Sequence, residues 1–78
     1  MPEIFRVYGW AFMIYADDHD PAHVHVLGPG WMIKIALCQP PDLLLIVGKP
    51  TRQEARKALR LVRARGDELM AAWEKIHG

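Results

Sequence analysis

Short apolar runs separated by Gly, Pro and Asp make up the first half of the chain, a pattern typical of β-strands joined by tight turns. The GPG at residues 28–30 predicts one such turn. Four strands with short connections favour an antiparallel meander. The runs that predict them are residues 4–8 (IFRVY), 10–15 (WAFMIY), 23–27 (HVHVL) and 31–37 (WMIKIAL).

A fifth apolar run, residues 43–48 (LLLIVG), follows Pro40 and Pro41, which favour a turn or an extended link. The run is apolar at odd and even positions alike, so a strand here presents apolar side chains on both faces. A single helix covers only one face of a sheet. The pattern therefore predicts an interface at this strand, formed with a second copy in a homodimer or with a small protein partner.

The clearest element is a helix over residues 51–76. Thr51 and Glu54 have the spacing of a capping box, in which each side chain satisfies a backbone N–H of the first turn. Apolar residues then recur at steps of three and four along one seam. We interpret Gly66 on this seam as a close backbone approach to the sheet, with a break into two helices capped by Asp67 as the alternative. The seam consists of Ala55, Leu59, Val62, Gly66, Leu69, Trp73 and Ile76.

These patterns predict an α+β fold: a small antiparallel sheet of four to five strands with one long C-terminal helix packed on one face. At 78 residues, we expect a single domain spanning residues 1–78. The composition, 51% hydrophobic and 24% charged, argues against a disordered chain. The single cysteine, Cys38, indicates a reducing compartment. Without a secretory leader or an apolar run of about 20 residues, the chain is expected to be cytoplasmic and free of the membrane.

Charge changes the interpretation of the helix. Residues 49–65 contain seven Lys or Arg and one acid, Glu54, although the formal net charge of the chain is only +1. A solvated outer face is the ordinary fate of such a stripe. With few acids available for ion pairs, however, these cations favour an anionic partner, either RNA or DNA or an acidic protein. The predicted binding residues are Arg52, Arg56, Lys57, Arg60 and Arg63.

The segment 16–26 (ADDHDPAHVHV) concentrates the candidate chemistry, with three of the four histidines of the chain and three aspartates. Aspartates in turns commonly accept hydrogen bonds from nearby backbone N–H groups, which is a purely structural reason for their presence. That reason does not explain His23 and His25, which share the face of their predicted strand opposite Val24 and Val26.

Two kinds of site are consistent with this cluster. His23 and His25, about 7 Å apart along one strand face, have a spacing found in metal sites, and His19 or an aspartate of the turn supplies a third ligand for zinc, manganese or iron. Alternatively, His23, His25 and His19 act as metal-free general acids and bases, with Asp18 or Asp20 orienting a ring.

The chain resembles a small bacterial family called domain of unknown function 4160. The resemblance covers nearly the whole chain and includes the opening Met-Pro-x-Ile, a following Tyr-Gly, and a C-terminal helix with Glu-Leu and Trp73. Its most specific part is the Asp-His-x-Pro-x-His-x-His string from Asp18 to His25. The family more often has Pro-Pro-His-Phe-His at residues 21–25, so Ala22 and Val24 depart from its pattern.

The resemblance implies no established activity. Family members are found as small genes beside another small family, an arrangement that suggests toxin-antitoxin pairs. We therefore hold two hypotheses. The first is a binding or regulatory component of a toxin-antitoxin-like operon that contacts protein or nucleic acid. The second is an enzyme, a metal-dependent or histidine-based phosphodiesterase or ribonuclease that uses Asp18, His19, His23 and His25.

Overall fold

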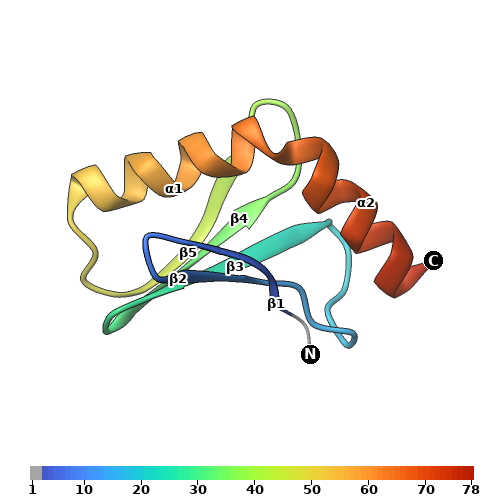
Figure 1. The fold of residues 1–78 in the computed structure, drawn as a ribbon, viewed down its shortest axis with the longest axis horizontal. Coiled ribbons are helices and arrows are strands. Elements are labelled where there is room, and N and C mark those ends of the chain that lie inside the picture. Colours follow the sequence, from blue (N-terminus) through green and yellow to red (C-terminus); the bar gives the residue numbers. More distant parts are fainter. Residues whose placement is uncertain (1–2) are drawn as a thin grey trace.

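The computed structural model describes residues 3–78 and shows five strands followed by two helices (Figure 1). The strands form one antiparallel sheet in the order β1-β2-β3-β4-β5. The α+β architecture and the meander predicted from the short apolar runs and their turn residues are confirmed. The strands are β1 (Glu3–Val7), β2 (Trp10–Met13), β3 (His23–Gly28), β4 (Trp31–Ala36) and β5 (Asp42–Gly48), and the helices are α1 (Arg52–Ala64) and α2 (Gly66–His77). Met1 and Pro2 of the Met-Pro-x-Ile motif lie outside the described residues.

Two-residue turns close the first and third hairpins. In the β1–β2 hairpin, Tyr8 and Gly9 have φ values of 58° and 76°, and two consecutive positive φ values give the turn the twist that suits flanking strands. In the β3–β4 hairpin, Pro29 precedes Gly30, whose φ is 76°. The turn predicted at residues 28–30 is therefore confirmed, because proline followed by a glycine at positive φ is the pattern of a type II turn.

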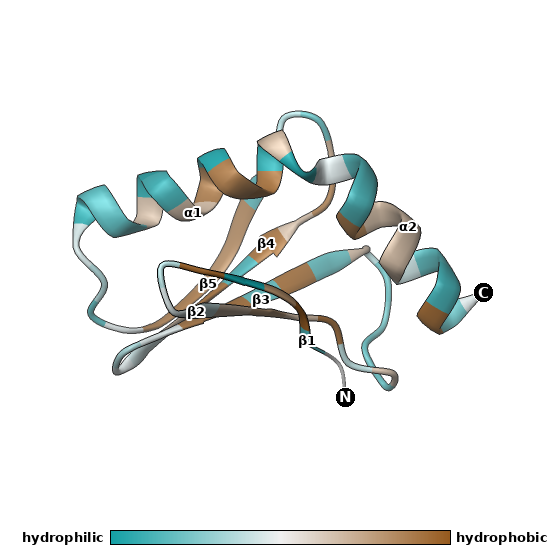
Figure 2. Ribbon diagram, viewed as in Figure 1, coloured by the Kyte–Doolittle hydropathy of each residue, from teal (hydrophilic) through white to brown (hydrophobic). Residues whose placement is uncertain are grey.

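The core lies between one face of the sheet and the helices. Val24 and Val26 pair across the ladder with Ile35 and Ile33, and because cross-strand partners share a face, all four point to the same side. On the opposite side of this core, α1 contributes Ala58 and Val62, and α2 contributes Leu69 and Trp73. Figure 2 shows the apolar side of α1 turned toward the sheet and its polar side turned outward.

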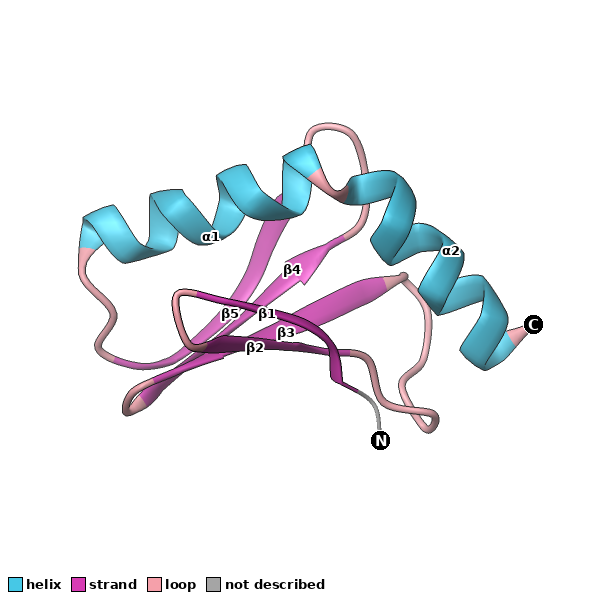
Figure 3. Cartoon of the chain, in the orientation of Figure 1, coloured by secondary structure: helices cyan, strands magenta, loops and turns pink. Residues whose placement is uncertain are grey.

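The prediction of one long helix is wrong: α1 ends at Ala64, Arg65 adopts φ −114° and ψ 28°, and α2 begins at Gly66 (Figure 3). One tertiary and one local contact of Arg65 accompany the break. Its guanidinium carbon lies 3.6 Å from the centre of the Phe5 ring, and Nη2 lies 2.8 Å from the Glu68 carboxylate. Arg65 thus contacts both β1 and the first turn of α2 at the point where the chain changes direction. Beyond this point, α2 continues past the end of the sheet.

The alternative of a break into two helices is confirmed, but Asp67 does not cap the second helix. Arg65 occupies the N-cap position of α2 without a side-chain cap hydrogen bond, and Asp67 lies within the first turn. Gly66 does permit a close approach, but to a loop side chain and not to the sheet: a Cβ there would lie 2.9 Å from Nε2 of Gln39. The capping box at the start of α1 is confirmed, with Glu54 N–H donating to Thr51 Oγ1 at 3.0 Å and Thr51 N–H donating to Glu54 Oε1 at 2.8 Å.

β5 is an edge strand, paired only with β4. Its pairing is regular from Gly48 to Leu45 and then shifts, so that Leu44 has no partner on β4. A run of its apolar side chains is exposed: Leu44, Leu45, Ile46 and Val47. Neither helix of the described chain has the length and apolar character needed to cross a membrane.

Candidate metal centre at the β2–β3 loop

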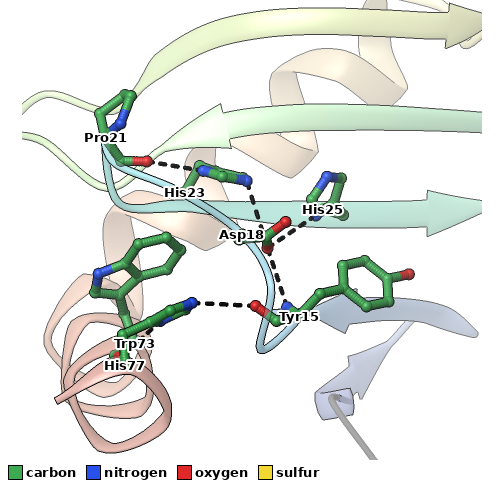
Figure 4. A network of polar contacts seen from close by, with 7 residues as sticks. All are labelled: Tyr15, Asp18, Pro21, His23, His25, Trp73 and His77. Carbon is green, nitrogen blue, oxygen red and sulfur yellow. Dashed lines mark hydrogen bonds and ion pairs between the residues drawn. The ribbon is translucent and has the colours of Figure 1, made fainter.

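Asp18 is held over strand β3 by the loop that joins β2 to β3 (Figure 4). Its Oδ2 accepts a hydrogen bond from the Tyr15 backbone N–H at 3.0 Å, and its own N–H donates to the Tyr15 carbonyl at 3.1 Å. This reciprocal pair is the structural role expected of an aspartate in a turn. It also aims the carboxylate at the two histidines of β3.

His23 is oriented by the backbone. Its Nδ1 lies 2.8 Å from the Pro21 carbonyl oxygen, and because a carbonyl only accepts, Nδ1 carries the proton. In the neutral ring, Nε2 then has a free lone pair, and this atom lies 3.4 Å from Asp18 Oδ2. The ring is 3% exposed and packs 5.3 Å from the Trp73 ring of α2. A histidine held in this way resembles a metal ligand fixed by an outer hydrogen bond.

His25 completes the group. Its Nδ1 lies 3.8 Å from Asp18 Oδ2, is shielded from solvent, and makes no hydrogen bond of accepted geometry with the described residues. The His23 and His25 rings are 5.0 Å apart, and the Tyr15 ring lies 5.0 Å from His25 on its other side. A buried ring nitrogen without a partner is costly unless something binds it.

The separations between these atoms are longer than ionic hydrogen bonds and somewhat longer than those of ligands already bound to one ion. An ionic hydrogen bond between imidazolium and carboxylate is about 2.7–2.9 Å long, shorter than the 3.4 Å and 3.8 Å observed. Two ligand atoms bound tetrahedrally to zinc at about 2.0–2.1 Å lie about 3.3 Å apart. Ligand atoms of Asp18, His23 and His25 all lie within 4.8 Å of one another. All three ligand atoms would move closer together to bind one ion.

The local electrostatics favour the neutral form of His25. Burial lowers its pKa below the usual 6.5, and the neighbouring His23 and Lys34 lower it further, although Asp18 and the Met13 backbone oppose them. Lys34 is the direct cross-strand neighbour of His25. A lowered pKa leaves the ring lone pairs available near neutral pH, and metal binding requires neutral histidine.

The structure brings together three of the four residues singled out in the cluster: Asp18, His23 and His25. The side chain of His19 is exposed and is not part of the group. Two contacts that position His23 were not predicted from the sequence: the hydrogen bond to the Pro21 carbonyl and the packing against Trp73. Pro21 and His23 are two residues apart, so the sequence itself offers a local signal for the hydrogen bond to the Pro21 carbonyl. The contact with Trp73 depends on the break between the helices.

His77 also supports the loop, which sequence reasoning missed. Its Nδ1 lies 3.0 Å from the Trp73 carbonyl and its Nε2 lies 3.1 Å from the Tyr15 carbonyl. Both partners only accept hydrogen bonds, so the ring satisfies both only when both nitrogens carry protons. His77 thereby ties the end of α2 to Tyr15, whose N–H holds the Asp18 carboxylate.

Comparison with known protein families places this geometry in context. Residues 9–74 match the family described as Domain of unknown function (DUF4160). The chain belongs to this family. The matched range contains Asp18, His23 and His25, so the candidate metal centre lies within the DUF4160 domain. No curated protein and no solved structure matches the chain.

The DUF4160 domain carries its predicted binding residues on the outer side of α1. Arg52, Arg56, Lys57, Arg60 and Arg63 are all exposed, and within residues 3–78 none of them forms an ion pair. Two surface grooves flank this stripe. One, of about 370 Å³, is lined by Pro40, Pro41, Arg56, Leu59, Arg60 and Arg63; the other, of about 220 Å³, by Tyr8, Lys57, Arg60, Leu61 and Ala64. Neither groove includes a residue of the candidate metal centre.

Proposed function

We propose that the chain is a metalloprotein in which Asp18, His23 and His25 bind one divalent ion of zinc, manganese or iron. One observation carries this proposal: Asp18 Oδ2, His23 Nε2 and His25 Nδ1 converge without a hydrogen bond joining the carboxylate to either ring. Two imidazoles and one carboxylate form a ligand set that zinc and non-haem iron sites use, and it leaves coordination positions open.

The surroundings of the site suit an anionic ligand at the open positions. Lys34, opposite His25 on the neighbouring strand, adds positive charge beside the ion. A bound divalent ion polarises a phosphoryl oxygen and activates a bound water at neutral pH. Within the proposal, the substrate class is therefore a phosphodiester, with the three ligands holding the ion and Lys34 attracting the phosphate.

Isothermal titration of the metal-free protein with Zn²⁺, Mn²⁺ and Fe²⁺ tests the proposal. The wild-type chain is expected to bind one ion. Asp18→Asn and His25→Ala are the decisive variants, because both side chains lie at the edge of the core, 14% and 15% exposed, and tolerate replacement better than His23. Each is expected to weaken binding at least about tenfold.

His19→Ala is the matched control, since His19 is an exposed histidine next to Asp18 in sequence. It is expected to bind as the wild type does. Failure of the wild-type chain to bind any of the three ions contradicts the proposal. So does a His19→Ala variant that loses binding as completely as His25→Ala.

A second candidate function rests on a different observation, the exposed cations of α1 that have no ion pairs among the described residues. We propose that α1 binds single-stranded nucleic acid, a binding role that suits a regulatory component of a toxin-antitoxin-like operon. Besides the arginines, the surface presents Tyr8, which is 64% exposed and lies in the groove with Lys57 and Arg60. Exposed aromatic rings among cations stack bases while the cations contact phosphates.

Fluorescence anisotropy with a labelled oligouridine tests this role. The triple variant Arg56→Glu, Arg60→Glu, Arg63→Glu is expected to abolish binding, whereas Lys75→Glu on α2 is the control and leaves it intact. Neutralising the same arginines with Gln is expected to reduce the slope of log K against log salt concentration by about 2, because three phosphate contacts are lost. Tighter binding of a poly-glutamate peptide than of oligouridine indicates an acidic protein partner and rejects the nucleic-acid role.

A further inference from the structure

The two edges of the sheet differ in a way that bears on assembly. Edge strand β1 carries an ion pair between Glu3 and Arg6 at 2.8 Å, and charges on an edge discourage pairing with another chain. Edge strand β5 has no charged residue between Leu43 and Val47. Its unpaired edge and its apolar side chains are both available to another strand.

The helix layer stops short of β5. Ile46 and Ile33 are direct cross-strand partners and share the face that α1 covers. Ile33 is fully buried, whereas Ile46 is 43% exposed. On the opposite face, Leu45 and Val47 are 48% and 52% exposed beside Lys34 and Met32. Figure 2 shows the apolar colour along most of β5, which passes behind α1 in this view.

Charges at the ends of β5 indicate which partner fits. Asp42 begins the strand, and Lys49 follows its last residue, Gly48. Both side chains are exposed, and neither forms an ion pair among residues 3–78. When a second copy of β5 pairs antiparallel, the Asp42 end of one copy meets the Lys49 end of the other. A parallel arrangement brings like charges together at both ends.

We propose that β5 pairs antiparallel with β5 of a second copy around a two-fold axis, which joins the two five-stranded sheets into one. Pro41 and Pro50 flank the strand and confine the pairing to the segment between them. Such an interface is self-complementary: apolar residues 44–47 of both copies meet at the centre, and an Asp42–Lys49 contact forms at each end. The candidate metal centre and the grooves along α1 lie outside this dimer interface.

Sedimentation equilibrium of the full chain over a wide concentration range tests the dimer. The wild-type chain is expected to sediment as a dimer at high concentration. Leu45→Lys is expected to raise the dissociation constant at least about tenfold, because it places a charge at the centre of the interface. Met70→Lys is the matched control, since Met70 is an exposed apolar residue of α2 and not of β5. It is expected to leave the constant unchanged.

A charge exchange tests the direction of pairing. Asp42→Lys alone is expected to weaken the dimer by about threefold, because two exposed ion pairs are lost and like charges meet. Asp42→Lys combined with Lys49→Asp is expected to restore the wild-type constant. If Asp42→Lys alone leaves the dissociation constant unchanged, as expected for parallel pairing, or if the double variant is no tighter than the single variant, the antiparallel two-fold arrangement is wrong.

Hydrogen exchange on the wild-type chain keeps the test independent of any variant that fails to fold. Dimerisation is expected to slow the exchange of β5 amides that face away from β4, with no change in β1. A chain that remains monomeric at every concentration overturns the proposal. A dimer in which β5 exchanges as in the monomer, or in which Leu45→Lys has no effect, overturns it as well.

Discussion

At the scale of single residues, the chemistry of this molecule depends on which ring nitrogens already have partners. His23 has one nitrogen on the Pro21 carbonyl and the other facing Asp18, whereas His77 has carbonyl oxygens on both sides. The first arrangement directs one ring nitrogen at another candidate ligand, whereas the second directs both ring nitrogens at backbone carbonyls. Sequence spacing is sufficient for the local partners, the Pro21 and Trp73 carbonyls, but not for the Tyr15 carbonyl, which is 62 residues from His77 and is placed by the fold.

The lowered pKa of His25 predicts a pH dependence of stability. Between that lowered value and 6.5, the unfolded chain binds a proton that the folded metal-free chain does not, so the free energy of unfolding falls as pH falls through this window. Urea denaturation of the metal-free chain from pH 8 to pH 5 measures it. His25→Gln is expected to lose less stability across the same range. Parallel curves for the two proteins would show that His25 does not contribute.

Burial of His23 predicts a cost that is separate from metal binding. His23→Ala removes the hydrogen bond to Pro21 and leaves space beside Trp73, so the metal-free chain is expected to lose about 2–3 kcal/mol of stability. His19→Ala, at an exposed position, is expected to stay within about 0.5 kcal/mol of the wild type. Chemical denaturation with chelator present compares them. Equal stabilities would contradict the packing described for His23.

At the scale of elements, the local patterns were sufficient for the strands and for the start of α1. Apolar runs bounded by Gly, Pro and Asp located the strands, and the Thr51–Glu54 spacing located the cap. The end of α1 was missed because residues 55–76 keep one apolar seam across the break. Arg65 leaves the helical conformation through contacts with Phe5, which is 60 residues distant in the chain, and no local pattern carries that information.

The two helix starts differ in their dependence on a side chain. Thr51→Ala removes half of the capping box and is expected to destabilise the protein by about 1 kcal/mol. Asp67→Ala is expected to cost less than about 0.5 kcal/mol, because Asp67 makes no cap hydrogen bond and contributes only its charge near the helix start. Thermal or urea unfolding distinguishes them. A larger effect at Asp67 would mean that α2 begins differently from the structure.

The end of α2 is expected to control the β2–β3 loop. His77→Ala removes the hydrogen bond to the Tyr15 carbonyl, so the loop that holds Asp18 is expected to exchange its amides faster and the affinity for Zn²⁺ to fall by about threefold or more. Hydrogen exchange and calorimetry report the two effects. Faster exchange without weaker binding would show that Tyr15 and Asp18 keep their geometry without His77.

At the scale of the whole molecule, three surfaces are distributed over one small sheet and its helices. The candidate metal centre lies where the β2–β3 loop meets α2, the basic grooves follow α1, and β5 forms the open edge (Figure 1). The sequence indicated the residue types of all three. It did not distinguish Asp18 from His19 as the third member of the cluster, because that choice depends on the reciprocal hydrogen bonds between Asp18 and Tyr15.

Elemental analysis of protein purified without an affinity tag tests the metal centre most directly. The wild-type chain is expected to carry zinc, manganese or iron in a ratio of one ion per chain, and His25→Ala, prepared in parallel, is expected to carry far less. Equal metal content in the two preparations, or none in the wild-type chain even after incubation with each ion, would contradict the assignment of Asp18, His23 and His25 as ligands.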